Sequence, residues 1–333
     1  MSAKARWGTA RRGPFAHVIH AYYSRLTCPA AAIAALLGLA SCDSGSSVEE
    51  ARLLALSEGT SEDWGIVRST LAWAWDDELH RLPLGETMAR IGVTFVGTAY
   101  VPQTLEVEGP ERLVVNLREL DCVTFVENVL ALGRFVHLHD PSVLDDDERL
   151  RAEYRRLLTE IRYRGGELEG YPSRLHYFSE WIADNQSRGL VHDVSRELGG
   201  MADDTPIDFM STHPDAYRQL SEPGIVDEIA RMEARLSARP RYFIGEAHIE
   251  DAAPDIANGD IIAATSTVDG LDIAHTGLAL VRDGSVFLLH APLVGSEVQI
   301  SEVPLSERVQ RIGGQDGIMV ARPLEPGTTA GDR

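Results

Sequence analysis

The clearest hydrophobic pattern in the chain lies in residues 121–136. Apolar side chains recur there at intervals of three or four residues, which predicts an α-helix with one buried face. The positions on this stripe are Phe125, Val129, Leu132 and Val136. Asp121 stands at the N-cap position, where its carboxylate can accept hydrogen bonds from the first free backbone N–H groups. Cys122 is therefore expected in the first turn of this helix.

Other stretches also have helical patterns. Residues 64–90 carry large apolar side chains at mixed spacing and are expected to be helical. Residues 145–165 predict a helix with a charged outer face that ends at two glycines, and residues 178–182 predict a short helix after a turn. The pattern of residues 187–238 is polar and helical, which indicates an embellishment on the core.

The last third of the chain predicts strands. The apolar run 260–265 follows the turn Asn258-Gly259, and two further runs, 275–281 and 285–290, flank Asp283-Gly284. An Asp-Gly pair between two apolar runs is typical of a two-residue β-hairpin turn. Helices followed by an antiparallel sheet predict the α+β fold class.

The first 41 residues differ in charge from the rest, because they contain five basic residues and no acidic residue. The apolar run 30–40 has the length of a signal-peptide core and is too short to cross a bilayer comfortably. The following Leu39-Ala40-Ser41-Cys42 resembles a lipobox, in which the cysteine is lipidated and becomes the mature N-terminus. An ordinary secretory signal with an incidental Cys42 is the alternative.

These features predict the organisation of the chain. We expect a lipoprotein signal peptide in residues 1–41, a lipidated Cys42 with a flexible tether in 42–60, one domain in 61–325 and a disordered tail in 326–333. The protein would be exported and held by its lipid on a membrane, facing the periplasm or cell wall.

The composition of the 333 residues, 44% hydrophobic and 25% charged, is ordinary for a soluble globular protein. The formal net charge is −20. Binding of nucleic acid by counterion release needs clustered Lys and Arg, so no nucleic-acid partner is expected. No spacing of His, Cys and Asp is typical of a zinc site, and we expect neither a metal nor a cofactor.

The three cysteines are Cys28, Cys42 and Cys122. After processing, Cys122 would be the one free thiol, and so either a small buried side chain or a reactive group. A helix N-terminus favours a thiolate over a thiol, which supports the reactive alternative. A cysteine of this kind still needs a histidine as proton acceptor.

Two histidines are expected to meet on the predicted hairpin. If Asp283-Gly284 is the turn, Gly277 pairs with His290, and His275 and His290 become diagonal neighbours on one face. Gly277 leaves space between them. This arrangement predicts a base, His275, oriented by a second imidazole, His290. Asp272, which lies before His275, is the alternative orienting group.

These residues resemble those of the NlpC-type papain-like cell-wall hydrolases, with a cysteine at a helix start, a histidine opening a strand and a polar third residue on the next strand. Several motifs in order resemble one subgroup, the N-acetylmuramoyl-L-alanine amidase-like family, from Trp64 to Pro323. The motifs are Leu120-Asp121-Cys122-Val123-Thr124-Phe125-Val126-Glu127-Asn128, Ser173-Arg174-Leu175-His176-Tyr177-Phe178-Ser179-Glu180-Trp181-Ile182, Asn258-Gly259-Asp260-Ile261-Ile262, His275-Thr276-Gly277, Leu289-His290-Ala291 and Gly317-Ile318-Met319-Val320-Ala321-Arg322-Pro323.

The resemblance implies a papain-like fold and cleavage of the amide between N-acetylmuramic acid and L-alanine in peptidoglycan or muropeptides. Carried over by motif, Cys122 is the nucleophile, His275 the base and His290 the third member. The thiolate would attack the carbonyl, His275 would protonate the leaving nitrogen, and water would hydrolyse the thioester. Thr276 departs from the family, where Val is frequent after the base.

Tyr171, Arg174 and His176 lie in a predicted loop. They could bind a carboxylate of the stem peptide, Arg174 with two parallel hydrogen bonds, or they could tie the loop to the core.

Three other functions remain open at this point. An endopeptidase that cuts within the stem peptide differs only in its products. A non-catalytic peptidoglycan-binding lipoprotein is disfavoured because Cys122, His275 and His290 are all present. A thiol acyltransferase that acts on lipid has no apolar groove-lining stretch to support it.

Overall fold

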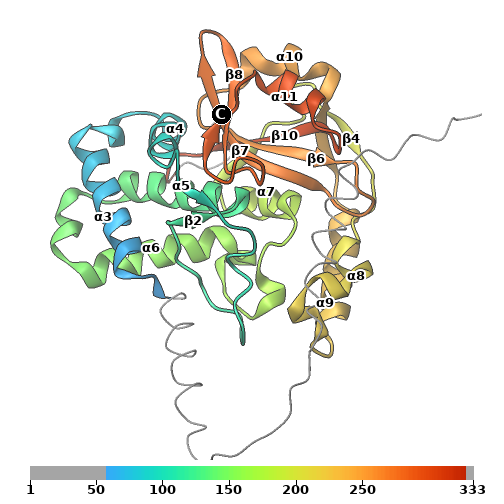
Figure 1. The fold of residues 1–333 in the computed structure, drawn as a ribbon, viewed down its shortest axis with the longest axis horizontal. Helices are drawn as coiled ribbons and strands as arrows, with labels where there is room; N and C mark the ends of the chain where they lie inside the picture. Colours follow the sequence, from blue (N-terminus) through green and yellow to red (C-terminus); the bar gives the residue numbers. More distant parts are fainter. Residues whose placement is uncertain (1–57, 328–333) are drawn as a thin grey trace, which may run out of the picture.

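A computed structural model describes residues 58–327 (Figure 1). The expected signal peptide, the lipidated Cys42 and nearly all of the tether lie outside the described residues, as do residues 328–333. Within the described range, no helix is long and apolar enough to cross a membrane.

Helices make up the first part of the described chain. They are α3 (Ser61–Asp76), α4 (Leu84–Thr94), α5 (Cys122–Leu138), α6 (Asp147–Arg162) and α7 (Phe178–Ser187). Residues 64–90 are largely helical as expected, but α3 and α4 are separate helices. Glu78 adopts a left-handed conformation with φ 56°, and Pro83 caps α4, so the chain turns between them.

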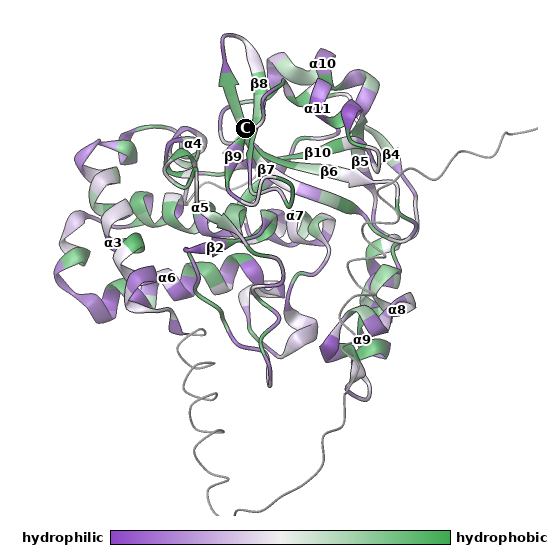
Figure 2. Cartoon of the chain, viewed as in Figure 1, coloured by the Kyte–Doolittle hydropathy of each residue, from purple (hydrophilic) through white to green (hydrophobic). Residues whose placement is uncertain are grey.

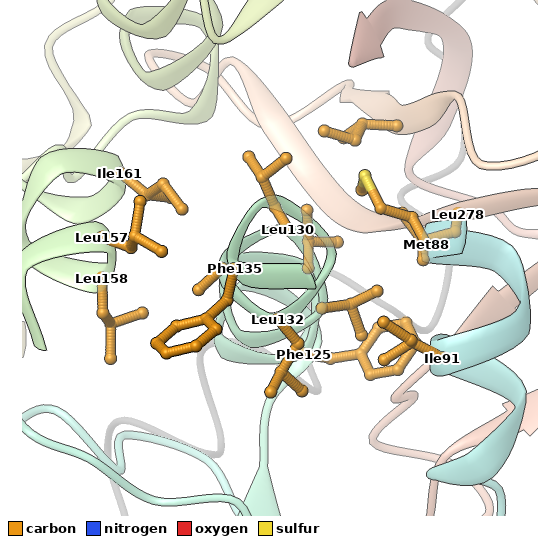
Figure 3. Packing of buried hydrophobic residues seen from close by; sticks show 14 of the residues in the cluster. Met88, Ile91, Phe125, Leu130, Leu132, Phe135, Leu157, Leu158, Ile161 and Leu278 are labelled. Carbon is orange, nitrogen blue, oxygen red and sulfur yellow. The ribbon is translucent and has the colours of Figure 1, made fainter. Parts of the chain in front are cut away.

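Helix α5 forms the centre of the helical layer, between α4 and α6 (Figure 3). The predicted stripe is buried, but so are all other residues from Thr124 to Val136, so the helix is covered on all sides and not on one face alone. Figure 3 shows Phe125 beside Met88 and Ile91 of α4, and Phe135 beside Leu157, Leu158 and Ile161 of α6. Burial of each such large side chain contributes about 1.5–3 kcal/mol to the stability of the fold. In Figure 2, α6 has a hydrophilic outer side, as its charged sequence predicts.

A buried ion pair joins α5 to α6. Arg162 Nε donates to Glu127 Oε2 at 2.7 Å, and both side chains are 2% exposed. Arg162 Nη1 also donates to the Val114 carbonyl at 2.7 Å, which holds the loop that leads towards Cys122. Arg162 therefore ties α6 both to α5 and to the segment that precedes Cys122.

The main sheet has eight strands in the order β4-β5-β10-β6-β7-β8-β9, with β3 also paired to β10, and every pairing is antiparallel. Its strands are β3 (Val191–Asp193), β4 (Met201–Asp203), β5 (Arg241–Gly245), β6 (Ile261–Ser266), β7 (Ile273–Arg282), β8 (Ser285–His290), β9 (Gln299–Ile300) and β10 (Gln315–Pro323). A separate parallel pair joins β1 (Ala99–Tyr100) to β2 (Glu119–Leu120), just before α5.

The expectation of a helical segment over residues 187–238 is only partly right. Helices α8 (Phe209–Thr212) and α9 (Ile225–Ser237) lie there, but β3 and β4 do as well. These strands are only three residues long, too short for an alternating pattern to be visible. Their partners β10 and β5 lie far along the chain, so pairing with distant strands determines them.

The two faces of the sheet are covered by different helices (Figure 1). Ala263, Leu278 and Leu289 point to the helical layer that contains α5, while their neighbours along the strands belong to a second core with α10 (Ile249–Ala252) and α11 (Leu305–Arg311). Ala279 and Leu288 lie on this second face.

The hairpin of β7 and β8 has the predicted turn and register. Asp283 and Gly284 both have positive φ, 50° and 79°, the backbone of a type I′ turn. Val281 pairs with Val286 and Leu278 with Leu289. Extended by one residue, this register sets Gly277 opposite His290.

Candidate active site

Cys122 is the first residue of α5 and is half-buried. Asp121 caps the helix as predicted, because its Oδ1 accepts hydrogen bonds from the N–H groups of Val123 (3.1 Å) and Thr124 (2.8 Å). Thr124 Oγ1 in turn accepts from the Asp121 N–H at 2.9 Å. This cap fixes the start of the helix and does not use the Cys122 amide.

The chain that enters α5 is held by Asp63 of α3. Asp63 Oδ1 accepts from the Leu117 N–H at 2.9 Å and from Arg118 Nε at 3.1 Å. The side chain is 1% exposed, and these bonds together with those from Thr60 lower its pKa in spite of the opposing effect of burial. The segment before Cys122 is therefore rigidly placed.

Thr276 connects α5 to β7. Its Oγ1 donates to the Cys122 carbonyl at 2.7 Å, and Thr276 is the residue next to His275. Val, which is frequent at this position in the family that the sequence resembles, could not make this bond. The candidate nucleophile and the candidate base thus lie on segments joined directly to each other.

His275 and His290 meet as the hairpin register predicts. His275 Nε2 lies 2.7 Å from His290 Nδ1, and the rings are edge-to-face with centroids 4.9 Å apart and an angle of 84°. A Cβ on Gly277 would lie 2.9 Å from the His290 Cβ, so only glycine leaves this space. If His275 Nε2 carries the ring proton and donates to His290, the Nδ1 of His275 is left as a proton acceptor.

Burial keeps both imidazoles neutral at pH 7. It lowers the pKa of His290 to about 3 and, together with the neighbouring His290 and Arg308, lowers the pKa of His275 well below its usual value. The expectation that the helix N-terminus favours a thiolate is not met at rest. Burial, assisted by the Asp121 carboxylate, raises the pKa of Cys122 to about 11. At rest, therefore, Cys122 is a thiol and His275 is a neutral imidazole.

Asp272, the alternative orienting group, has other partners. Its Oδ2 accepts from the Ser179 N–H at 2.8 Å, and its Oδ1 accepts from the Ile273 N–H at 2.7 Å. It therefore holds the start of β7 against α7. The hydrogen bonds place His290, and not Asp272, against His275.

The predicted substrate-binding residues form a buried network. Arg174, 4% exposed, lies over the Tyr171 ring at 4.9 Å and pairs with Glu106 and Glu111. His176 Nε2 lies 2.9 Å from the Tyr171 carbonyl. Burial also lowers the pKa of His176 well below its usual value. These contacts tie the loop to its neighbours, and a role in substrate binding stays a prediction.

Arg308 of α11 was missed by sequence reasoning. Its charge lowers the pKa of both His275 and His290. Burial lowers the pKa of Arg308 itself, and the Cys122 side chain partly opposes this change. In the sequence it looks like an ordinary charge on a short helix, with no pattern to single it out.

Two further features of the described residues bear on ligands. No group of three or more His, Cys, Asp or Glu side chains there is placed to hold a metal ion. A small cavity of about 70 Å³ lies at the end of β6, lined among others by Asp203, Arg241 and Asp272. Cys122, His275 and His290 do not line it.

Comparisons with known proteins identify the family of this chain. The family model described as AmiA-like, N-acetylmuramoyl-L-alanine amidase-like, matches residues 90–315. A crystal structure of an N-acetylmuramoyl-L-alanine amidase from Bacteroides uniformis is 36% identical, with a TM-score of 0.65, covering 72% of this chain and 99% of that one. No curated protein matches the chain.

Two other solved structures are similar. One from Bacteroides fragilis, provisionally named a xylanase, is 37% identical with a TM-score of 0.62 and covers 69% of this chain and 98% of that one. A Legionella pneumophila protein of the DUF1460 family is 19% identical with a TM-score of 0.53, covering 84% and 96%, which shows a shared fold alone. With its family match spanning most of the described residues, the chain belongs to the AmiA-like family of N-acetylmuramoyl-L-alanine amidase-like proteins.

Proposed function

We propose that this protein is a peptidoglycan hydrolase that cleaves the amide between N-acetylmuramic acid and L-alanine, with Cys122, His275 and His290 as its catalytic groups in an NlpC-type, papain-like fold. The observation that carries the proposal is the 2.7 Å contact between His275 Nε2 and His290 Nδ1, on a strand whose Thr276 is hydrogen-bonded to the carbonyl of Cys122, the first residue of α5. Membership of the amidase-like family supports the choice of bond.

The chemistry follows from the resting thiol and neutral imidazole. As the Cys122 sulfur attacks the amide carbonyl, His275 Nδ1 accepts the thiol proton, and the Cys122 N–H is placed to stabilise the oxyanion. His290 accepts the Nε2–H of the resulting imidazolium and so stabilises it. The proton then passes to the departing nitrogen as the C–N bond breaks. Water hydrolyses the thioester and restores the thiol.

A thiol beside two imidazoles is suited to acyl transfer. Glycoside hydrolysis, the activity in the provisional name of the Bacteroides fragilis structure, mostly needs two carboxylates on either side of the bond. The cluster around Cys122 contains Asp121, but this carboxylate caps α5. The amidase is therefore the function that this site supports best.

We also propose that the chain is an exported lipoprotein with Cys42 as its anchor and residues 61–325 as one catalytic domain. The basic leader, the apolar run and Leu39-Ala40-Ser41-Cys42 support this. Metabolic labelling with a fatty acid tests it: wild type is expected to incorporate the label, and Cys42→Ala to lose it. Labelling of Cys42→Ala would refute the anchor.

Product analysis tests the proposed bond. A soluble form of the protein, residues 43–333, which begins just after the proposed lipidated Cys42, is incubated with purified muropeptides, and the products are identified by mass spectrometry. Release of intact stem peptides beginning with L-alanine is the expected result. Shortened stem peptides would instead identify an endopeptidase, and unchanged muropeptides would contradict hydrolysis and favour a binding protein.

Thr276 provides a test of how Cys122 is positioned. Thr276→Val removes the hydrogen bond to the Cys122 carbonyl at nearly constant volume, so kcat is expected to fall about tenfold with little change in KM, because a small displacement of the nucleophile slows attack. Thr276→Ser keeps the hydroxyl and is expected to stay within about threefold of wild type. Equal kcat for the Val and wild-type enzymes would show that the bond does not position Cys122.

A further inference from the structure

Arg308 lies on the same face of the sheet as the two histidines. Its helix α11 packs against β8 and β10, where Leu305 and Val309 join Leu288 in the second core. Because residues two apart on a strand share a face, His290 lies on the side that α11 covers. His275 shares this side, since it lies four residues before Ala279, another member of that core.

The Arg308 guanidinium is buried without a counterion. The residue is 9% exposed, and its side chain donates to Gln315 Oε1 at 3.4 Å, a long and weak bond. No carboxylate of the described residues lies within ion-pair distance of it, whereas the buried Arg162 and Arg241 each have one. Burying an unpaired charge is costly, and a negative charge that forms close to it offsets this cost.

The groups around Cys122 differ in charge. Asp121 at the helix start is the negative neighbour, while His275 and His290 are neutral at pH 7. Burial lowers the pKa of Arg308 to about 10, which still leaves it charged at pH 7. Arg308 of α11 interacts electrostatically with the Cys122 side chain and with both histidines, so its guanidinium lies near all three groups.

We propose that Arg308 is an electrostatic positioning residue of the active site, whose fixed positive charge stabilises the negative charge that develops on the Cys122 sulfur. When the proton leaves the thiol, the buried guanidinium gains the anion that it lacks at rest. The inference builds on the proposed role of Cys122 as nucleophile, but it does not depend on which bond is cut.

Alkylation of Cys122 tests this without any peptidoglycan substrate. The soluble form of residues 43–333, which omits Cys42, contains Cys122 as its one cysteine, so iodoacetamide and iodoacetate both report on that sulfur. Each reaction forms a carbon–sulfur bond from the thiolate as iodide leaves. Iodoacetamide is neutral and its rate against pH gives the thiol pKa, while iodoacetate is anionic and also senses the local field.

Arg308→Gln is expected to raise the apparent thiol pKa by about one unit and to slow iodoacetamide about tenfold at pH 7. The reaction with iodoacetate is expected to slow even more, so that the ratio of the iodoacetate rate to the iodoacetamide rate falls. Arg308→Lys retains the charge and is expected to stay within about threefold of wild type. Arg134→Gln is the matched control, because Arg134 is also buried without an ion pair but lies roughly 18 Å along α5 from Cys122.

An unchanged pKa and an unchanged rate ratio in Arg308→Gln, with melting temperature near that of wild type, would overturn the proposal. An equal loss in Arg134→Gln would also overturn it, because the effect would then come from disturbed packing. If Arg308→Gln does not fold, Arg308→Met replaces it. If neither variant folds, the wild-type protein provides the test. The ratio of its iodoacetate rate to its iodoacetamide rate must exceed that of free cysteine under the same conditions, and a lower ratio refutes the proposal.

Discussion

Replacing Cys122 by alanine is expected to lower the rate of amide hydrolysis by a factor on the order of 10⁴ to 10⁶, because the nucleophile that forms the acyl-enzyme is lost. The change removes one sulfur atom from a half-buried position, and the cap by Asp121 and the bond from Thr276 use other atoms. The fold is therefore expected to persist, with a melting temperature close to that of wild type. Initial rates on purified muropeptides measure the activity, and a thermal melt of the same sample measures the melting temperature.

Two comparisons make this result specific. Cys122→Ser keeps a hydroxyl in place of the thiol and is expected to retain little activity, because the hydroxyl is a far weaker nucleophile. His275→Ala is expected to be nearly as inactive, since the thiol, with its pKa of about 11, then has no proton acceptor. Hydrolysis by Cys122→Ala above one tenth of the wild-type rate would show that another group attacks the bond.

Replacing Glu127 by alanine is expected to destabilise the fold by about 3–5 kcal/mol, because it leaves the Arg162 charge buried without its partner. For a domain of this size the melting temperature should fall by roughly 10 °C. The Val114 carbonyl would be the one remaining partner of the Arg162 guanidinium. Denaturant unfolding followed by circular dichroism measures the free energy.

The double replacement Glu127→Leu with Arg162→Met separates charge from packing. It removes both charges at similar volume, and such exchanges are often neutral or stabilising, so it should be more stable than Glu127→Ala. The surface pair of Arg156 and Glu153 offers a control, because exposed pairs contribute about 0–1 kcal/mol. A loss below about 1 kcal/mol in Glu127→Ala would contradict the assignment of a structural ion pair.

The parts of the site that could be predicted from the sequence depend on local signals. The Asp121 cap, the apolar stripe of α5 and the Asp283-Gly284 turn each involve residues close in sequence, and together they predicted the start of the helix and the contact between His275 and His290. Each of these signals has a strong intrinsic geometry.

The features that were missed depend on tertiary placement. Arg308 matters because α11 folds over the histidines, and the direction of the Cys122 pKa depends on burial that no sequence pattern shows. The short β3 and β4 form only against partners far along the chain. The break between α3 and α4 is different, because Pro83 was visible in the sequence and is a signal for a helix boundary.

The position of both histidines on one hairpin also affects how the site forms during folding. The contact between His275 and His290 spans 15 residues, whereas the hydrogen bond from Thr276 to Cys122 spans 154. A hairpin closes within microseconds, but contacts between distant segments must wait until intervening chain has ordered. His275 and His290, the proposed base and its orienting partner, can therefore assemble early, while Cys122 reaches its place only when α5 docks on the sheet. An incompletely folded chain would carry Cys122 without its proposed base, so attack assisted by His275 would be possible only in the finished fold.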